Sequence, residues 1–148
     1  FQVEWGQLDF LILDLPPGTG DAQLTLVQSL ALDGGLIVTT PQDVALMDVR
    51  RGIQMFQRTS VPILGILENM SGFECSHCGQ VTEIFRGKGG EKAAQDYGVP
   101  FLGKIPLEPA TAISGDSGIP VLTSDPEGKL ATVMMSTAHR IMELVATP

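Results

Sequence analysis

Residues 10–21 of the 148-residue chain read FLILDLPPGTGD, and this stretch decides the fold class. The apolar run predicts a fully buried strand over residues 8–13, which ends abruptly at Asp14. Proline cannot continue a sheet because it has no N–H to donate, and glycine lets a loop lie close to a ligand; both residue types follow, as Pro16, Pro17, Gly18 and Gly20. Open α/β sheets bind ligands outside the carboxyl ends of their strands. The stretch therefore predicts a strand of a parallel sheet with a ligand-binding loop behind it.

Asp14 is the candidate ligand-binding side chain of this loop. Magnesium prefers hard oxygen ligands and usually keeps several of its waters. A carboxylate at a strand end is therefore a candidate outer-sphere partner of a Mg-nucleotide. The alternative is an aspartate that only caps the following helix, and we expect that simpler role for Asp21.

The rest of the chain alternates strand and helix signals, which predicts an α/β fold with a mostly parallel sheet and helices on both faces. Strands are expected at residues 8–13, 35–40, 62–68 and 101–105, with a short one at 81–85. Helices are expected at residues 21–32, 41–58 and 90–97, with one turn at 111–114 and a last helix from the capping signal at Ser124 to about Val145. The loops after three of the strands should converge on one sheet edge.

The composition limits the classes of partner. A length of 148 residues suits one domain, and 43% hydrophobic with 18% charged residues is typical of a globular protein. A net charge of −8 argues against nucleic acid and anionic membranes as partners, because both need clustered Lys and Arg. No apolar run reaches the roughly 18 residues of a membrane span. Two cysteines are too few for a disulfide scaffold, so we expect a reducing, cytoplasmic location.

Cys75 and Cys78 form a CxxC pair, which supplies two soft thiolate ligands at chelate spacing. A tetrahedral metal site needs four ligands, and the chain holds no other cysteine. A symmetric dimer would complete the count with two copies of the pair. Zinc, an iron–sulfur cluster and a redox dithiol all fit the residues, and so do two unligated thiols.

Asn69 directly follows the strand expected at residues 62–68. An amide side chain carries donors and an acceptor, so it can read the edge of an adenine. A turn-forming asparagine is the ordinary alternative. Lys88 lies in a glycine-rich loop, but its surroundings do not match the phosphate-binding pattern GxxxxGK[ST], and no such motif occurs in the chain.

The chain resembles the Mrp/ApbC-type P-loop ATPases, which are iron–sulfur cluster carriers within the MinD/ParA-like group. Seven motifs carry the resemblance in order: residues 14–21, 39–43, 68–71, 75–79, 87–90, 102–106 and 116–120. It implies a P-loop NTPase fold of the SIMIBI type, with residues 1–148 as the C-terminal portion of one ATPase domain and the cysteine loop at about 69–90.

The resemblance also implies roles for individual residues. Asp14 corresponds to the switch II carboxylate near Mg2+, and Gly18 belongs to the same switch loop. Asn69 and Pro106 correspond to the residues around the adenine. Cys75 and Cys78 correspond to the ligands of a [4Fe–4S] cluster that bridges a homodimer, and the family is thought to use ATP while loading the cluster or passing it to apo-proteins.

Two departures from the family pattern matter. The Walker A loop would lie before Phe1, so we expect an N-terminally truncated domain that hydrolyses ATP hardly at all and has a gap beside residues 8–13. An arginine that often follows the Ile-Pro-Leu loop is replaced by residues 110–112, Ala-Thr-Ala. The alternatives are a MinD/ParA-type partitioning ATPase, disfavoured by the cysteines and the acidic charge, and a zinc-binding structural module.

Overall fold

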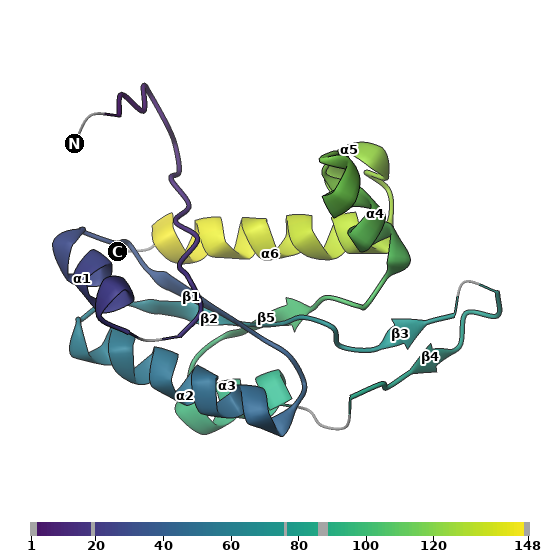
Figure 1. Ribbon diagram of the computed structural model, residues 1–148, viewed down its shortest axis with the longest axis horizontal. Helices are drawn as coiled ribbons and strands as arrows, with labels where there is room; N and C mark the ends of the chain where they lie inside the picture. Colours follow the sequence, from purple (N-terminus) through teal and green to yellow (C-terminus); the bar gives the residue numbers. More distant parts are fainter. Residues whose placement is uncertain (1–2, 19, 76, 86–88, 147–148) are drawn as a thin grey trace.

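A three-stranded parallel sheet forms the centre of the computed structural model, which describes residues 3–18, 20–75, 77–85 and 89–146. The strands lie in the order β1 (Gly35–Thr39), β2 (Ile63–Glu68) and β5 (Phe101–Lys104), as Figure 1 shows. Both pairings are parallel, with Thr39 opposite Glu68 and Glu68 opposite Lys104. The carboxyl ends of all three strands therefore lie at the same edge, and the α/β class with a parallel sheet is confirmed.

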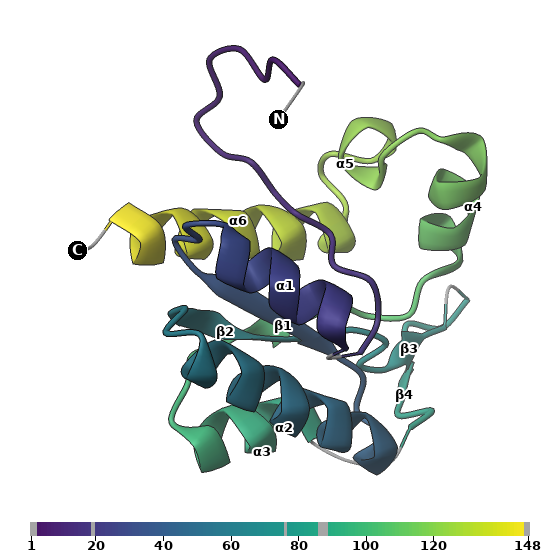
Figure 2. The ribbon, with the colours of Figure 1, turned by 60° about the vertical axis from the view of Figure 1, so that its left-hand side comes forward.

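Helices cover both faces of the sheet, as predicted. α2 (Asp43–Arg58) and α3 (Gly89–Tyr97) pack on one face, and α6 (Lys129–Ala146) packs on the other (Figures 1 and 2). The main core lies under α2 and α3, and α1 (Asp21–Ser29) adds Val27 to it. Its members also include Val49, Ile53, Phe56 and Ile66. Within the described ranges, no helix is both long enough and apolar enough to cross a bilayer.

β1 shows a strict alternation of burial. Ile37 and Thr39 face the core, whereas Leu36 and Val38 are exposed on the opposite face. β1 is also the last strand on its side of the described sheet. The result is a strand with one open edge and one exposed apolar face.

The prediction of a strand at residues 8–13 is wrong. These residues form an extended segment outside any sheet, and their apolar side chains are exposed, up to 90% for Ile12 (Figure 1). A strand buried on both faces needs a hydrogen-bonded neighbour and a covering layer. No described strand pairs with this segment, so its apolar pattern is present without the surroundings that would make it a strand.

Two helix starts differ from the prediction. Gly20 is the N-cap of α1 without a side-chain cap, so Asp21 lies in the first turn, where its charge favours the helix dipole. Ser124 closes the short α5 (Val121–Ser124) instead of opening the last helix. The turn after it, closed by the bond from Gly128 N–H to Asp125 O (3.1 Å), delays the start of α6 to Lys129.

The remaining elements are a helix and a short hairpin, and both differ in length from the prediction. The single turn expected at residues 111–114 is a nine-residue helix, α4 (Pro109–Ser117), which begins with a proline and ends at Gly118 with φ +69°. The short strand expected at 81–85 is shorter still, as β4 (Val81–Thr82), and pairs antiparallel with β3 (Phe73–Glu74). This hairpin extends away from the sheet in Figure 1.

The N-terminus of α3 is in close contact with the loop after β1. A Cβ at Gly89 would stand 2.8 Å from the carbonyl oxygen of Pro41, and one at Gly90 would stand 3.0 Å from the Cβ of Glu68. Real Cβ atoms do not approach a backbone oxygen so closely, so the helix can dock here only with glycine at its start. The glycine pair is thus a packing requirement of the fold.

Substitution Gly89→Ala should destabilise the protein by about 1–3 kcal/mol, because the added methyl forces α3 away from Pro41. Gly115→Ala is the matched control, since it lies inside α4 with open space around it and should be neutral or stabilising by about 0.5–1 kcal/mol. Urea unfolding followed by circular dichroism measures both. Equal effects of the two changes would contradict the close approach.

Candidate functional site

Backbone hydrogen bonds join the loops at the carboxyl edge of the sheet. Asn69 N–H donates to Thr39 O at 2.7 Å, and Ile105 N–H donates to Glu68 O at 2.7 Å. Ser71 N–H in turn donates to Ile105 O at 2.9 Å. The loops after β2 and β5 are therefore fixed against each other, and this edge brings two of the predicted site residues, Asn69 and Pro106, into one region.

Asn69 forms a turn in this structure. Its side-chain Oδ1 accepts a hydrogen bond from Met70 N–H at 2.8 Å, and Met70 adopts the left-handed conformation with φ +56°. This is the turn-forming contact that asparagine commonly makes. The amide nitrogen Nδ2 is a second functional group of the same side chain, and it is the one that could donate to a base.

Pro106 lies at the point where the sheet edge meets the hairpin. It is half-buried, and Leu107 on its far side donates its N–H to Gly72 O at 2.7 Å and forms a parallel bridge with Phe73. Together with the Ser71–Ile105 bond, these contacts continue the ladder of the sheet into β3. The proline is thus held between two hydrogen-bonded residues.

Asp14 and Gly18 lie on the segment that does not join the sheet. Both are exposed, and Gly18 has φ +97°. The side chain of Gln23 fixes the loop between them, since its Nε2 donates to Pro16 O at 3.1 Å and Pro17 O at 3.0 Å. The structure thus places Asp14 outside the strand edge expected for it. Thr19 of this loop, and Gly87 and Lys88 of the glycine-rich loop, lie outside the described residues.

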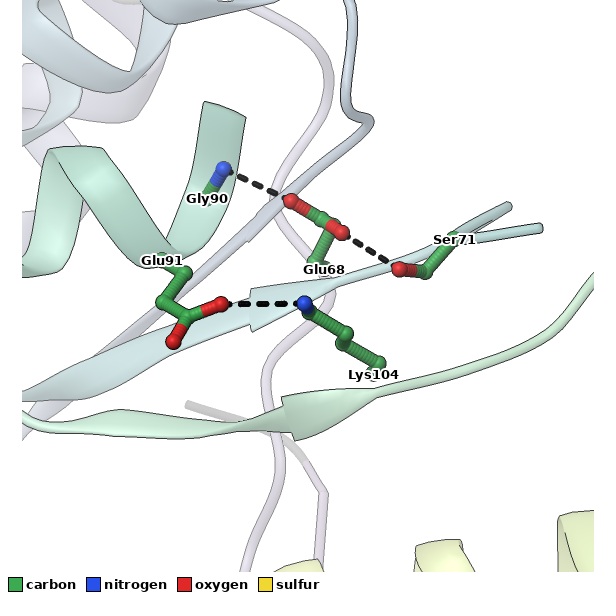
Figure 3. A network of polar contacts seen from close by, with 5 residues as sticks. All are labelled: Glu68, Ser71, Gly90, Glu91 and Lys104. Carbon is green, nitrogen blue, oxygen red and sulfur yellow. Dashed lines mark hydrogen bonds and ion pairs between the residues drawn. The ribbon is translucent and has the colours of Figure 1, made fainter. Parts of the chain in front are cut away.

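Glu68 is the polar centre of the edge and was not singled out from the sequence. It is 1% exposed, and its carboxylate accepts hydrogen bonds from Ser71 Oγ and from Gly90 N–H, the latter at 2.7 Å (Figure 3). Nearby, Lys104 Nζ at the end of β5 pairs with Glu91 in the first turn of α3 at 2.9 Å. The available signal was a carboxylate closing an otherwise apolar strand.

The two cysteines lie at the turn of the β3–β4 hairpin as free thiols. Cys75 is partly exposed and Cys78 is exposed. Cys75 N–H donates to Gln80 O at 3.0 Å, and Gly79 N–H donates to Cys75 O at 2.8 Å, with Gly79 at φ +70°. The turn therefore holds both thiols at the far end of a short, hydrogen-bonded arm.

The turn also activates one of the thiols. Hydrogen bonds from the backbone N–H groups of His77 and Cys78, together with the Cys78 side chain, lower the pKa of Cys75 below its ordinary value. Hydrogen bonds to the charged form favour that form. The thiolate is the nucleophile and metal ligand of cysteine, so the turn prepares Cys75 for either role.

The donor set is half of a tetrahedral site. Among the described residues, no group of three or more His, Cys, Asp or Glu side chains is arranged to hold a metal ion. Two thiols on one exposed arm nevertheless match half of a four-thiolate centre. The residues present therefore fit half of the ligand set of a metal or cluster.

Comparison with known sequences identifies the family of the chain. A family model described as ParA: NUBPL iron-transfer P-loop NTPase matches residues 1–142. The iron–sulfur cluster carrier protein of Methanocaldococcus jannaschii is 52% identical over 144 residues, which cover 97% of this chain and 49% of that protein. A mitochondrial iron–sulfur protein required for NADH dehydrogenase in Arabidopsis thaliana is 45% identical over 95% of this chain and 45% of its own length. The chain spans about half the length of the curated relatives it matches.

Solved structures show the same fold. A nucleotide-binding protein from Archaeoglobus fulgidus, in complex with ADP and with cobalt found in it, superposes with a TM-score of 0.73 at 38% identity, covering 86% of this chain and 51% of that one. The cell division ATPase MinD of Pyrococcus furiosus superposes with a TM-score of 0.72 at 26% identity, covering 92% and 52%. The sheet with its two helical layers is thus a MinD-like P-loop NTPase fold. By its sequence match over residues 1–142, the chain belongs to the NUBPL iron-transfer family of ParA-like P-loop NTPases.

Proposed function

We propose that this protein carries a [4Fe–4S] cluster between the cysteine arms of two copies and passes it to apo-proteins. The observation that carries the proposal is the β3–β4 hairpin, which presents two free thiols on a projecting arm and lowers the pKa of one of them. Two copies of Cys75 and Cys78 supply the four thiolates that such a cluster takes. An exposed position at the end of an arm also suits a cargo that must leave.

Nucleotide binding belongs to the sheet edge in this proposal. Asn69 and Pro106, which lie at this edge, are beside the adenine. Asp14 is near Mg2+ and Gly18 belongs to the loop that senses the terminal phosphate, and these two roles require the segment outside the sheet to reach the edge. The ADP complex of the structural relative supports a nucleotide as the ligand. No phosphate-binding motif occurs in the 148 residues, so we propose that they form the C-terminal portion of a single ATPase domain and depend on a phosphate-binding loop outside them.

Two other functions are weighed against cluster transfer. A partitioning ATPase of the MinD/ParA type would share the fold, but the relatives at 45–52% identity are named for iron–sulfur proteins. A zinc-binding module would use the same thiols without turnover. The free, reactive thiols also favour a reducing compartment such as the cytoplasm, where cysteines stay unpaired.

Anaerobic reconstitution with iron and sulfide tests the cluster directly. The wild-type chain should develop the broad visible absorbance of thiolate-bound iron, with one cluster for two chains in native mass spectrometry. Cys75→Ser and Cys78→Ser should each abolish it, because each removes two of four ligands from the dimer. His77→Ala, which changes one of the two residues between the cysteines, should keep it. A stable zinc complex that never takes up iron would contradict the proposal.

The activated thiol predicts a shifted pH profile for alkylation. Because backbone N–H groups of His77 and Cys78 lower the pKa of Cys75, its thiolate is present at lower pH than that of an ordinary cysteine. The rate of reaction with iodoacetamide, followed by peptide mass spectrometry, should therefore reach half its maximum at lower pH in the folded chain than in urea. Identical midpoints in the two states would show that the turn has no such effect.

Two substitutions at Asn69 separate its turn from a contact with the base. Asn69→Asp keeps an oxygen to accept from Met70 N–H but removes the amide donor, whereas Asn69→Ala removes both. If Asn69 reads adenine, both variants should lower the preference for ADP over GDP, by about tenfold for one lost hydrogen bond to a base. Competition binding measures this preference in a protein that includes the phosphate-binding loop on which these residues are proposed to depend. If Asn69→Asp keeps the wild-type preference for ADP over GDP, Asn69 forms the turn and does not contact the base.

A further inference from the structure

The carboxylate of Glu68 holds two segments that are distant in sequence. Both of its oxygens are occupied: one accepts from Ser71 Oγ and the other from Gly90 N–H at 2.7 Å (Figure 3). The side chain is 1% exposed, so these contacts replace its water. Hydrogen bonds to a charged acceptor are stronger than those between neutral groups, and leaving a buried acceptor without a donor costs free energy.

The two partners of Glu68 stand at opposite ends of the cysteine loop. Ser71 lies in the loop that leads from β2 to β3, and Gly90 lies in the first turn of α3, where the chain returns. The residues between them contain β3, both cysteines and β4. One carboxylate therefore closes the whole excursion at its base, which limits the conformations open to it.

The strand that leads out to the cysteines, β3, is the departing limb of the loop, and β4 with the residues after it is the returning limb. The departing limb has further contacts of its own. Its backbone is joined to the loop after β5 by the bond from Leu107 N–H to Gly72 O at 2.7 Å and by the bridge of Phe73 to Leu107. Glu74 in β3 also pairs with Lys129 of α6 at 2.6 Å, but the lysine side chain is 70% exposed, and such surface pairs contribute little.

We call the two hydrogen bonds of the Glu68 carboxylate the clamp. The returning limb lies beside the clamp, because Glu83 and Phe85 line a cavity of about 50 Å3 together with Glu68 and Ser71. The buried anchor common to both limbs is thus Glu68.

We propose that Glu68 is the positioning residue of the cysteine arm. It touches neither sulfur, and it sets how firmly the hairpin presents Cys75 and Cys78 by holding the two ends of their loop together. Only the last consequence, that a firm arm binds its cargo better, rests on the proposed function. The clamp itself is a property of the metal-free chain.

Hydrogen exchange in the metal-free chain tests the clamp. Glu68→Ala and Ser71→Ala should each speed exchange of the Cys75 and Gly79 amides about tenfold or more, the factor expected when a hydrogen bond to a charged group is lost. Amides of β1 and α2 should keep their protection. Lys104→Met is the control, because it breaks the exposed ion pair to Glu91 on the same helix and removes neither hydrogen bond of Glu68.

The conservative variant Glu68→Gln separates hydrogen bonding from charge. Its Oε1 can accept from Gly90 N–H while its Nε2 donates to Ser71 Oγ, so exchange in the hairpin should stay within about threefold of wild type. Exchange in Glu68→Gln as fast as in Glu68→Ala would overturn the proposal, and so would unchanged exchange in both Glu68→Ala and Ser71→Ala. If Glu68→Ala does not fold by circular dichroism, Ser71→Ala decides.

Cobalt(II) provides a second readout that also judges the proposed function. Thiolate-to-cobalt absorbance should show binding by wild type, with an affinity about tenfold lower in Glu68→Ala and restored in Glu68→Gln, in the range known for residues that support metal ligands. If Glu68→Ala exchanges faster than wild type but binds cobalt with the same affinity, the positioning role is overturned. If wild type binds no cobalt, the metal function fails, while hydrogen exchange still decides the clamp.

Discussion

A carboxylate that leaves water must find hydrogen-bond donors, and in this protein that constraint falls on Glu68 at the end of the central strand. Its donors come from the loop that follows β2 and from the start of α3, 22 residues later. Satisfying them requires α3 to begin directly against the sheet edge, and this in turn requires Gly89 and Gly90. The end of β2, the start of α3 and the base of the cysteine arm thus meet at one buried group.

The same edge joins the two chemistries proposed for the protein. The ladder of β2 and β5 continues through the Ser71–Ile105 and Gly72–Leu107 bonds into the first strand of the arm. Asn69 and Pro106, assigned to the nucleotide, are therefore only a few residues from the strand that leads to Cys75. A rearrangement at the sheet edge has a short, hydrogen-bonded route to the thiols.

The strands predicted correctly are those that pair with one another in the described sheet. The apolar runs of β1, β2 and β5 end at polar or proline residues, and each strand finds its neighbour among the others. Residues 8–13 carry an equally apolar pattern, but pairing depends on a neighbouring strand that periodicity cannot supply. The cysteine pair was visible from its spacing. The Glu68 clamp was not, because its meaning depends on Gly90, which is distant in sequence and contributes only a backbone N–H.

The unpaired side of β1 has a consequence for work with the protein in solution. An open strand edge beside exposed Leu36 and Val38 is a template for another chain, and the apolar residues near Ile12 add a second adhesive surface. Samples of this chain alone will therefore tend to self-associate through backbone pairing, independently of any metal. A dimer found by gel filtration has meaning for the cysteine arms only when its population follows the iron content, and mild detergent or a lower protein concentration will distinguish the two kinds of assembly.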